Sequence, residues 1–251
     1  MMNHTDAIHK QTYRLRSYQV DQRGRARPDM LLSFMLDCAW EHTKGTDFSY
    51  NELNDEGQLW VLSRFLAVFH KMPQWDDEIN VETWGKGTDK LFGLRDFIIH
   101  SGSGEKLVSA TSAWLIIDRK TTRIQRIDTL GKNFPMQLER HELDVKLDKL
   151  ESRPSEKTGF EYTVRYTDLD VNRHVNSAKY VQWILDSFSV ETLECKILKS
   201  FEINFLAEAR LNDRLFVSTA TDGDDNYCEV RRGESELCRA KVIWCGEGAG
   251  V

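Results

Sequence analysis

The sequence predicts an α+β protein built from two tandem copies of one fold, in which a buried helix is followed by several strands. Two segments, residues 28–41 and 178–188, are apolar around most of a helical turn, which predicts helices that other structure covers on nearly every side. After each of these segments the pattern changes to strand-like runs separated by turns. The same order of elements therefore occurs twice.

The first copy is expected to start with a strand over Gln11–Val20 and a turn at residues 21–25. A helix over Pro28–Glu41 follows, for which Asp29 is the expected N-cap. A mixed loop over Thr43–Gln58 leads out of the helix. Strands are expected at Leu59–Phe69, Glu78–Trp84, Leu91–His100 and Leu107–Ile117.

The second copy follows a stretch that is dense in charge and lacks apolar periodicity, which we interpret as a connector. A strand at Gly159–Tyr166, a polar cluster and the second helix come next. Further strands are expected at Lys199–Phe205, Arg214–Ala220, Tyr227–Arg232 and Glu236–Trp244, before a short tail that contains glycine. The predicted boundaries are 8–136 for the N-terminal domain, 137–157 for the connector and 158–246 for the C-terminal domain.

The two copies align at constant offsets. An offset of 149 residues pairs identical residues up to the helices, and an offset of 136 pairs similar residues after them. The matched pairs include Tyr13/Tyr162, Arg16/Arg165, Asp21/Asp170, Asp37/Asp186, Phe65/Phe201 and Phe69/Phe205. The copies differ where the second has Asn172, His174 and Glu208, because the first has two arginines and a methionine there. This difference predicts a single active site in the C-terminal half.

Composition, net charge and residue spacing limit the classes of function that this protein can have. Hydrophobic residues make up 40% of the 251 residues, enough for a proper core, and the net charge of -6 argues against a nucleic-acid partner. No apolar run approaches the length of a membrane span, and the polar N-terminal stretch has no apolar signal core, so we expect a cytoplasmic protein.

The five cysteines are irregularly spaced, which favours reduced thiols over disulfides. The histidines lack metal-ligand spacing, so we expect neither a metal nor a cofactor.

The most informative stretch is residues 168–176, which holds two Asp, two Asn and one His at the start of the second helix. The first turn of a helix carries unpaired N–H groups and the positive end of the helix dipole, so this position can stabilise a developing negative charge. Each residue also has a structural interpretation. His174 could cap or hydrogen-bond, Asp170 could form a turn, Asn176 is expected to cap the helix, and Asp168 is expected in a turn or facing solvent.

The run from Asp168 to Leu185, DLDVNRHVNSAKYVQWIL, closely resembles the signature of the acyl-ACP thioesterases of plants and bacteria. The first half resembles the N-terminal domain of that family in four motifs: Leu59–Arg64, Pro73–Glu78, Glu82–Trp84 and Ala110–Trp114. The similarity extends from about Tyr13 to Val217. It implies a double hotdog, that is, two tandem hotdog domains in which a curved antiparallel sheet wraps a long helix.

The resemblance implies that the catalytic group is Asp170, Asn172, His174 and Glu208. Ala209 stands where the plant enzymes carry cysteine, so a cysteine nucleophile at that position cannot apply to this chain. A G-x-S-x-G motif is also missing, which makes water the simplest nucleophile. We expect Glu208, with His174, to activate this water, while Asn172 and the helix start polarise the thioester carbonyl.

The family also places an apolar acyl pocket in the N-terminal half. Its expected lining is Phe34, Met35, Leu59, Trp60 and Leu62, with Trp84 and Trp114 as further candidates. Acyl carrier proteins are acidic, so the docking surface should be basic. The densest basic run supplies Arg119, Lys120, Arg123 and Arg126. An ordinary solvated hairpin edge is the alternative interpretation of that run.

Three functions follow from these observations. The first is hydrolysis of acyl carrier protein thioesters, in which phosphopantetheine carries the acyl chain. The second is the same reaction on acyl-CoA, and the third is a non-catalytic acyl-thioester sensor. A dehydratase of the same fold is disfavoured because its expected motifs are missing. The fold needs no partner to be complete, so a monomer and a homodimer are both compatible with the sequence.

Overall fold

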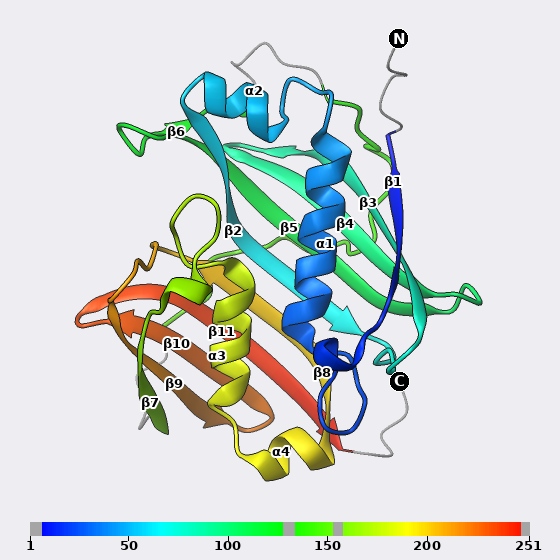
Figure 1. The fold of residues 1–251 in the computed structure, drawn as a ribbon, viewed down its shortest axis with the longest axis vertical. Helices are drawn as coiled ribbons and strands as arrows, with labels where there is room; N and C mark the ends of the chain where they lie inside the picture. The colour runs from blue at the N-terminus through cyan, green and yellow to red at the C-terminus, as the bar shows by residue number, and fades with distance from the viewer. Residues whose placement is uncertain (1–6, 128–133, 153–157, 247–251) are drawn as a thin grey trace. The chain divides into compact units, whose positions relative to one another are not determined.

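A computed structural model describes residues 7–127, 134–152 and 158–246 (Figure 1). Parts of four predicted segments lie outside these residues: the start of the polar N-terminal stretch, residues 128–133 of the N-terminal domain, residues 153–157 of the connector and the end of the glycine-containing tail. The chain divides into two compact units, one formed mainly by residues up to Leu147 and the other mainly by residues from Asp148 onward. The domain boundaries given above stay a prediction.

The first unit contains an antiparallel sheet with the strand order β1-β3-β4-β5-β2, and β6 pairs with β5. Its strands are β1 (His9–Arg14), β2 (Gln58–Phe69), β3 (Glu78–Asp89), β4 (Phe92–Ser101), β5 (Lys106–Asp118) and β6 (Ile124–Gln125). The four long strands correspond to the four predicted runs. The predicted first strand is shorter than expected, because a 3₁₀ turn at Ser17–Gln19 replaces its C-terminal part.

The second unit repeats this arrangement with the strand order β7-β9-β10-β11-β8. Its strands are β7 (Thr158–Thr163), β8 (Lys196–Phe205), β9 (Arg214–Asp222), β10 (Asp225–Arg232) and β11 (Ser235–Gly246). Each strand of the second unit thus takes the place of one strand of the first. A 3₁₀ turn at Tyr166–Asp168 again shortens the predicted first strand.

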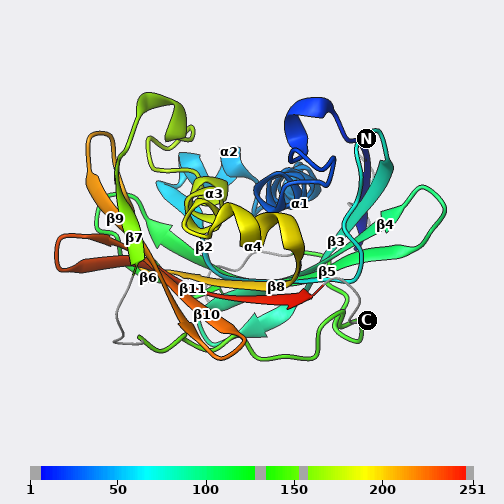
Figure 2. The ribbon, with the colours of Figure 1, turned by 90° about the horizontal axis from the view of Figure 1, so that it is seen from below.

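One long helix lies over one face of each sheet (Figure 2). It is α1 (Pro28–Thr43) in the first unit and α3 (Ser177–Asp186) in the second. In α1 the thiol of Cys38 lies 3.6 Å from the carbonyl oxygen of Val81 in β3, so the helix contacts its sheet closely. A helix covered by an antiparallel sheet is the hotdog arrangement, and the predicted fold is confirmed for both units.

The start of α1 differs from the prediction. Arg27 occupies the N-cap position and Pro28 the first helical position, where its missing N–H costs nothing. Asp29 is therefore not the N-cap: it lies in the first helical turn, with only 5% of its surface exposed. In the first turn a carboxylate still stabilises the helix through the helix dipole.

Two short helices were missed. The predicted loop after α1 contains α2 (Tyr50–Asp55), and α4 (Val190–Cys195) follows α3. Each has a serine N-cap, because Ser49 accepts from the N–H of Glu52 at 3.4 Å and Ser189 from that of Thr192 at 3.2 Å. Six residues are too few to show apolar periodicity, so only the capping serines could have predicted these helices.

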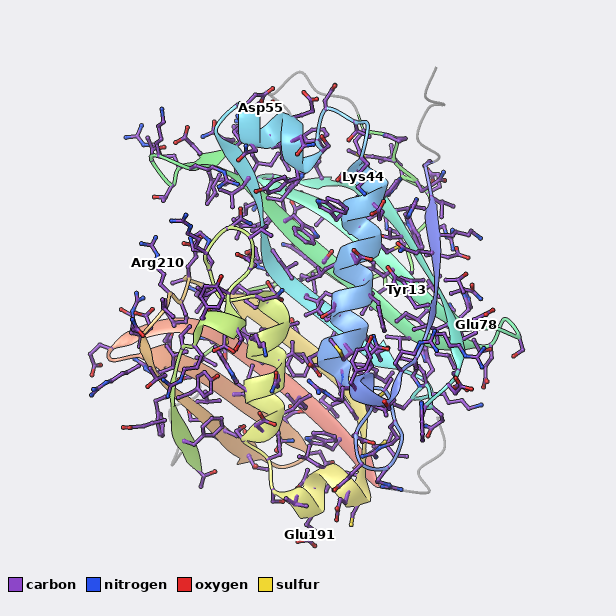
Figure 3. All side chains as sticks on the ribbon, in the orientation of Figure 1. Tyr13, Lys44, Asp55, Glu78, Glu191 and Arg210 are labelled. Atoms are coloured by element: carbon purple, nitrogen blue, oxygen red, sulfur yellow. The ribbon has the colours of Figure 1, made fainter. Side chains whose placement is uncertain are left out.

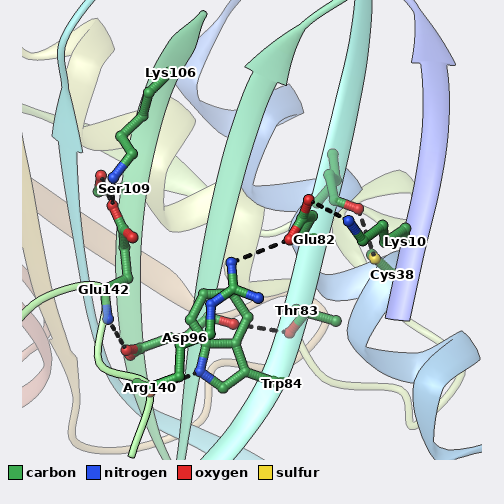
Figure 4. Close-up of polar contacts among 11 residues, drawn as sticks. Lys10, Cys38, Glu82, Thr83, Trp84, Asp96, Lys106, Ser109, Arg140 and Glu142 are labelled. Carbon is green, nitrogen blue, oxygen red and sulfur yellow. Dashed lines mark hydrogen bonds and ion pairs between the residues drawn. The ribbon is translucent and has the colours of Figure 1, made fainter. Parts of the chain in front are cut away.

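The first part of the predicted connector, residues 137–143, is bound to the first sheet. The N–H of Gln137 donates to the carbonyl of Gly85 at 2.8 Å, and the indole N–H of Trp84 donates to the carbonyl of Arg140 at 2.9 Å. The guanidinium of Arg140 lies 3.8 Å from the Trp84 ring centre, and the N–H of Glu142 donates to Asp96 at 2.7 Å (Figure 4). These side chains are on the face opposite to α1, because residues alternate along a strand.

Candidate active site

Asp170 organises the loop that carries the predicted polar cluster. Its N–H donates to the carbonyl of His174 at 2.8 Å, and Leu169 forms a β-bridge with Val175. One carboxylate oxygen, Oδ1, accepts from the N–H of Asn172 at 2.8 Å and from that of His174 at 3.2 Å. Asp170 is thus a turn residue, as its structural interpretation predicted, and it fixes the backbone on which Asn172 and His174 stand.

A second loop, between β8 and β9, brings Glu208 to His174. The N–H of Val175 donates to the carbonyl of Ala209 at 3.1 Å, which joins the two loops. The N–H of Ala209 in turn donates to the hydroxyl of Tyr180, a buried residue of α3, at 3.0 Å. As a result, Oε2 of Glu208 lies 3.0 Å from Nε2 of His174. The sequence did not identify Tyr180 as a positioning residue, because it stands among the apolar residues of α3 and such a residue is expected in the core.

Three polar atoms of this group have no partner among the described residues: Nδ1 of His174, Oε1 of Glu208 and Oδ2 of Asp170. The side chains of His174 and Glu208 are 26% and 35% exposed, so water can reach them. An imidazole held by a carboxylate, with acceptor atoms left over, can take a proton from water and return it to a leaving group. The arrangement is therefore suited to general acid–base chemistry.

The start of α3 also has the properties that the sequence predicted. Asn176 is the N-cap, as expected, since its Oδ1 accepts from the N–H of Ala178 at 2.9 Å. Its carbonyl accepts from the N–H of Lys179 at 2.9 Å. The N–H of Ser177 then has no partner among the described residues. One donor at the positive end of the helix dipole thus stays available.

Asp168 lies in a turn, one of its two expected places, but it does not face solvent. It is 2% exposed, and its carboxylate accepts from the hydroxyl of Tyr162 at 3.0 Å and from the N–H of Arg165 at 2.8 Å. It ends a 3₁₀ turn, and burial is possible because these donors satisfy its oxygens. Asp168 also lines an open cavity of about 290 Å³ between β7 and α3, which contains none of the four predicted catalytic residues.

The equivalent loop of the first unit has the same backbone but different chemistry. The N–H of Asp21 donates to the carbonyl of Arg25 at 2.8 Å, and Oδ1 of Asp21 accepts from two backbone N–H groups, as in Asp170. The other carboxylate oxygen, Oδ2, is 2.8 Å from the guanidinium of Arg25. Oδ2 of Asp21 is therefore paired with an arginine, whereas Oδ2 of Asp170 has no partner among the described residues.

The residues predicted for the acyl pocket all belong to the first unit, but they form two groups. Phe34 on α1 packs against Tyr13 of β1, with ring centres 4.4 Å apart. Trp60 on β2 packs against Phe48 and Trp114, at 5.7 and 6.4 Å. Met35, Leu59 and Leu62 are buried. Trp84 belongs to neither group, because it packs against the connector on the other face of the sheet.

The basic run predicted for docking spans the turn between β5 and β6 and ends at Arg126, directly after β6, in the first unit. All four of its charged residues are exposed: Arg119, Lys120, Arg123 and Arg126. Asp118 holds the turn by accepting from the N–H groups of Lys120 and Thr121 at 3.0 and 2.7 Å. Arg119 also donates to the carbonyl of Gln58 at 3.4 Å. These contacts are those of an ordinary hairpin turn, and docking there stays a prediction.

The cysteines are free, and three of them, Cys38, Cys228 and Cys238, are buried. Burial raises the pKa of the Cys38 and Cys228 thiols to about 12, and it raises that of Cys238 as well. Since the thiolate is the reactive form, these three should resist a thiol reagent at about pH 8.

We expect the disulfide reagent DTNB to modify Cys195 rapidly in the native protein and to reach the three buried thiols only after unfolding. The absorbance of the released thiolate measures this, and Cys195→Ser is the control that removes the rapid phase. Rapid modification of the buried thiols in that variant would contradict the structure.

The described residues contain no group of three His, Cys, Asp or Glu side chains that could hold a metal ion. Within the same residues, none of the helices is both long and apolar enough to span a membrane.

Comparison with known proteins connects these features to one family. The model of the acyl-ACP thioesterase N-terminal domain matches residues 6–129, and that of the C-terminal domain matches residues 151–244. A crystal structure of an acyl-ACP thioesterase from Bacteroides thetaiotaomicron has a TM-score of 0.78 and 27% identity, over 95% of this chain and 98% of that one.

Curated relatives from plants agree with this result. The chloroplastic palmitoyl-acyl carrier protein thioesterase of Arabidopsis thaliana is 29% identical over 87% of this chain and 56% of its own length. A chloroplastic acyl carrier protein hydrolase of Cuphea viscosissima is 27% identical over 97% of this chain and 64% of its own length. The chain thus spans less than two thirds of these relatives. Because family models match most of the chain, in both units, it belongs to the acyl-ACP thioesterase family.

Proposed function

We propose that this protein hydrolyses acyl thioesters of acyl carrier protein and releases the free fatty acid. The observation that carries the proposal is the contact of 3.0 Å between His174 and Glu208, on a loop that Asp170 holds and beside the start of α3. Family membership supports the reaction class and the carrier, since the relatives above are named for acyl carrier protein substrates. The cytoplasmic location expected from the sequence stays a prediction.

In the proposed reaction, water attacks the carbonyl carbon of the thioester while the pair of His174 and Glu208 takes its proton. The carbonyl oxygen becomes an oxyanion, which the N–H of Ser177 and the amide of Asn172 stabilise. The C–S bond then breaks, and the sulfur of the pantetheine arm leaves with the proton that the pair had taken. Asp170 contributes by positioning, because its Oδ1 fixes the N–H groups of both Asn172 and His174.

The direct test is thiol release from acyl carrier protein thioesters with chains of about 8 to 18 carbons, with the same chains on CoA for comparison. A Cys195→Ser background keeps the exposed thiol from contributing to the signal. The proposal predicts release that depends on chain length and a higher kcat/KM for the protein carrier. A higher kcat/KM for the acyl-CoA thioesters would favour an acyl-CoA thioesterase instead. Saturable binding of the thioesters without release would show the non-catalytic sensor instead.

The same assay tests the role of Asn172. Asn172→Ala should lower kcat by about 10² to 10³, because one oxyanion donor is lost. Circular dichroism should show an unchanged fold, since the loop bond uses the backbone N–H and not the side chain.

Asn176→Ser is the matched control, because it removes a nearby amide and keeps a good N-cap. It should retain most of the activity. Nearly full activity of Asn172→Ala would show that its amide does not stabilise the oxyanion.

A further inference from the structure

Three backbone hydrogen bonds combine two loops of the second unit into one surface around His174. The N–H of Val164 donates to the carbonyl of Asp213 at 3.0 Å, and that of Asn212 donates back to Val164 at 3.1 Å. The third bond is the one from Val175 to Ala209 described above. Residues 164–175 and 206–214 therefore present their side chains together, and we call this surface the catalytic rim.

The catalytic rim carries four exposed arginines: Arg165, Arg173, Arg210 and Arg214. The Arg210 side chain is 68% exposed and lies 3.7 Å from Glu208 (Figure 3). The other three form no ion pair with any described residue. Exposed, unpaired arginines contribute little to the stability of a fold. They stand out here because the whole chain has a net charge of -6.

Two large apolar side chains are exposed on the same rim. Tyr166 is 81% exposed and Val171 is 83% exposed, more than any other large hydrophobic residue described. Arginine and tyrosine are the residue types that dominate binding energy at protein interfaces. Exposed apolar side chains among cationic ones therefore indicate a protein partner with an acidic surface.

The equivalent loops of the first unit carry their basic residues at other positions. They have the same backbone bonds, since Leu15 donates to Asp77 at 2.9 Å as Val164 donates to Asp213. The residues at the four arginine positions are Arg16, Gly24, Gln74 and Glu78. Only one of them is basic and one is acidic. The two units thus place their arginines differently: the first unit also carries Arg23 and Arg25, at the positions of Asn172 and His174, and Arg25 is paired with Asp21.

We propose that the catalytic rim is the docking surface for the acidic acyl carrier protein, an inference that rests on the proposed function. Arg165, Arg173 and Arg214 attract the acidic face of the carrier, and Tyr166 and Val171 pack against its apolar side chains. The pantetheine arm then starts beside His174, so the carrier is held where the thioester must react. The rim is an alternative to the basic run Arg119–Arg126 of the first unit.

The test compares charge reversals on the two surfaces. Arg165→Glu with Arg214→Glu removes rim charge without touching His174 or Glu208, and Lys120→Glu with Arg123→Glu does the same at the β5–β6 turn. Arg16→Glu is the matched control, because Arg16 is the counterpart of Arg165 in the first unit. Each variant is assayed with an acyl carrier protein thioester and with the same acyl chain on pantetheine alone.

The rim variant should lose about tenfold or more in kcat/KM for the carrier protein thioester, with a weaker dependence on salt. Its rate with acyl-pantetheine should be unchanged, which also shows that it is folded. The two other variants should match the wild type on both substrates. A loss in the β5–β6 variant with none in the rim variant would overturn the proposal.

Binding separates this proposal from the proposed function. The affinity of the acyl carrier protein thioester is measured by calorimetry in a His174→Ala background, which prevents turnover of the thioester. If the wild type cleaves no thioester, weaker binding by the rim variant still supports the docking surface and only the hydrolase proposal fails. Equal affinity with and without the rim charges would rule out docking at this surface.

Discussion

His174→Ala is expected to lower kcat for acyl carrier protein thioesters by about 10² to 10⁴, the range of a lost general acid–base residue. Nε2 of His174 is 3.0 Å from Glu208, and Nδ1 is free to accept a proton from water. Alanine removes both, while the backbone bond from residue 174 to Asp170 remains. Steady-state kinetics measure the loss, and KM should change little because we expect the acyl chain and the carrier to be held by residues other than His174.

Glu208→Gln should have a comparable effect, because glutamine cannot hold the imidazole as a carboxylate does. If the two residues act as one unit, the kcat of the double variant should be close to that of the less active single variant. Glu191→Gln is the control, since Glu191 is an exposed carboxylate on α4 (Figure 3). Losses that multiply in the double variant would show that His174 and Glu208 act in separate steps.

The fold could be predicted from the sequence largely because it is repeated. The offset of 149 residues pairs Asp21 with Asp170, and in the structure both aspartates accept from the second and fourth N–H groups after them. The buried helices were recognisable because α1 and α3 are apolar on nearly every side. Strong local patterns of this kind determine where long elements form.

The missed features depend on contacts that local patterns do not encode. The charged stretch was expected to be a connector without regular structure of its own, yet it binds the first sheet. The Arg140 side chain donates to Glu82, its carbonyl accepts from Trp84, and the N–H of Glu142 donates to Asp96. Strand β5 is buried from Leu107 to Ala113 because both of its faces are covered. The turn at Asp168 was expected but its burial was not, since that burial depends on donors from Tyr162 and Arg165.

The candidate site was predictable in part. Asp170, Asn172 and His174 stand in one short motif, and the resemblance pointed to all three. The contact between Glu208 and His174 could not be derived from spacing, because it depends on the bridge from Val175 to Ala209 and on the Tyr180 hydroxyl. The rim arginines were missed since they come from separate segments and form no basic run.

The largest expected effect on stability is that of Asp96→Ala. The Asp96 carboxylate lies 2.8 Å from the ammonium of Lys86, and the two side chains are 0% and 6% exposed. Removing one partner of a buried pair leaves the other charge unpaired, which costs about 3 to 5 kcal/mol. For a chain of this size that corresponds to a fall in the unfolding midpoint of about 6 to 20 °C. The connector should also loosen, because Asp96 accepts from the N–H of Glu142.

Two comparisons identify the cause of that loss. Arg14→Ala breaks an ion pair of the same length with Asp76, but those two side chains are 52% and 62% exposed. Calorimetry should therefore show little change in the unfolding midpoint of this variant. Replacing both buried partners, Asp96→Leu with Lys86→Met, should recover much of the stability, because no unpaired charge remains. If the double variant is as unstable as Asp96→Ala, the bond to the connector, and not the charge left on Lys86, accounts for the loss.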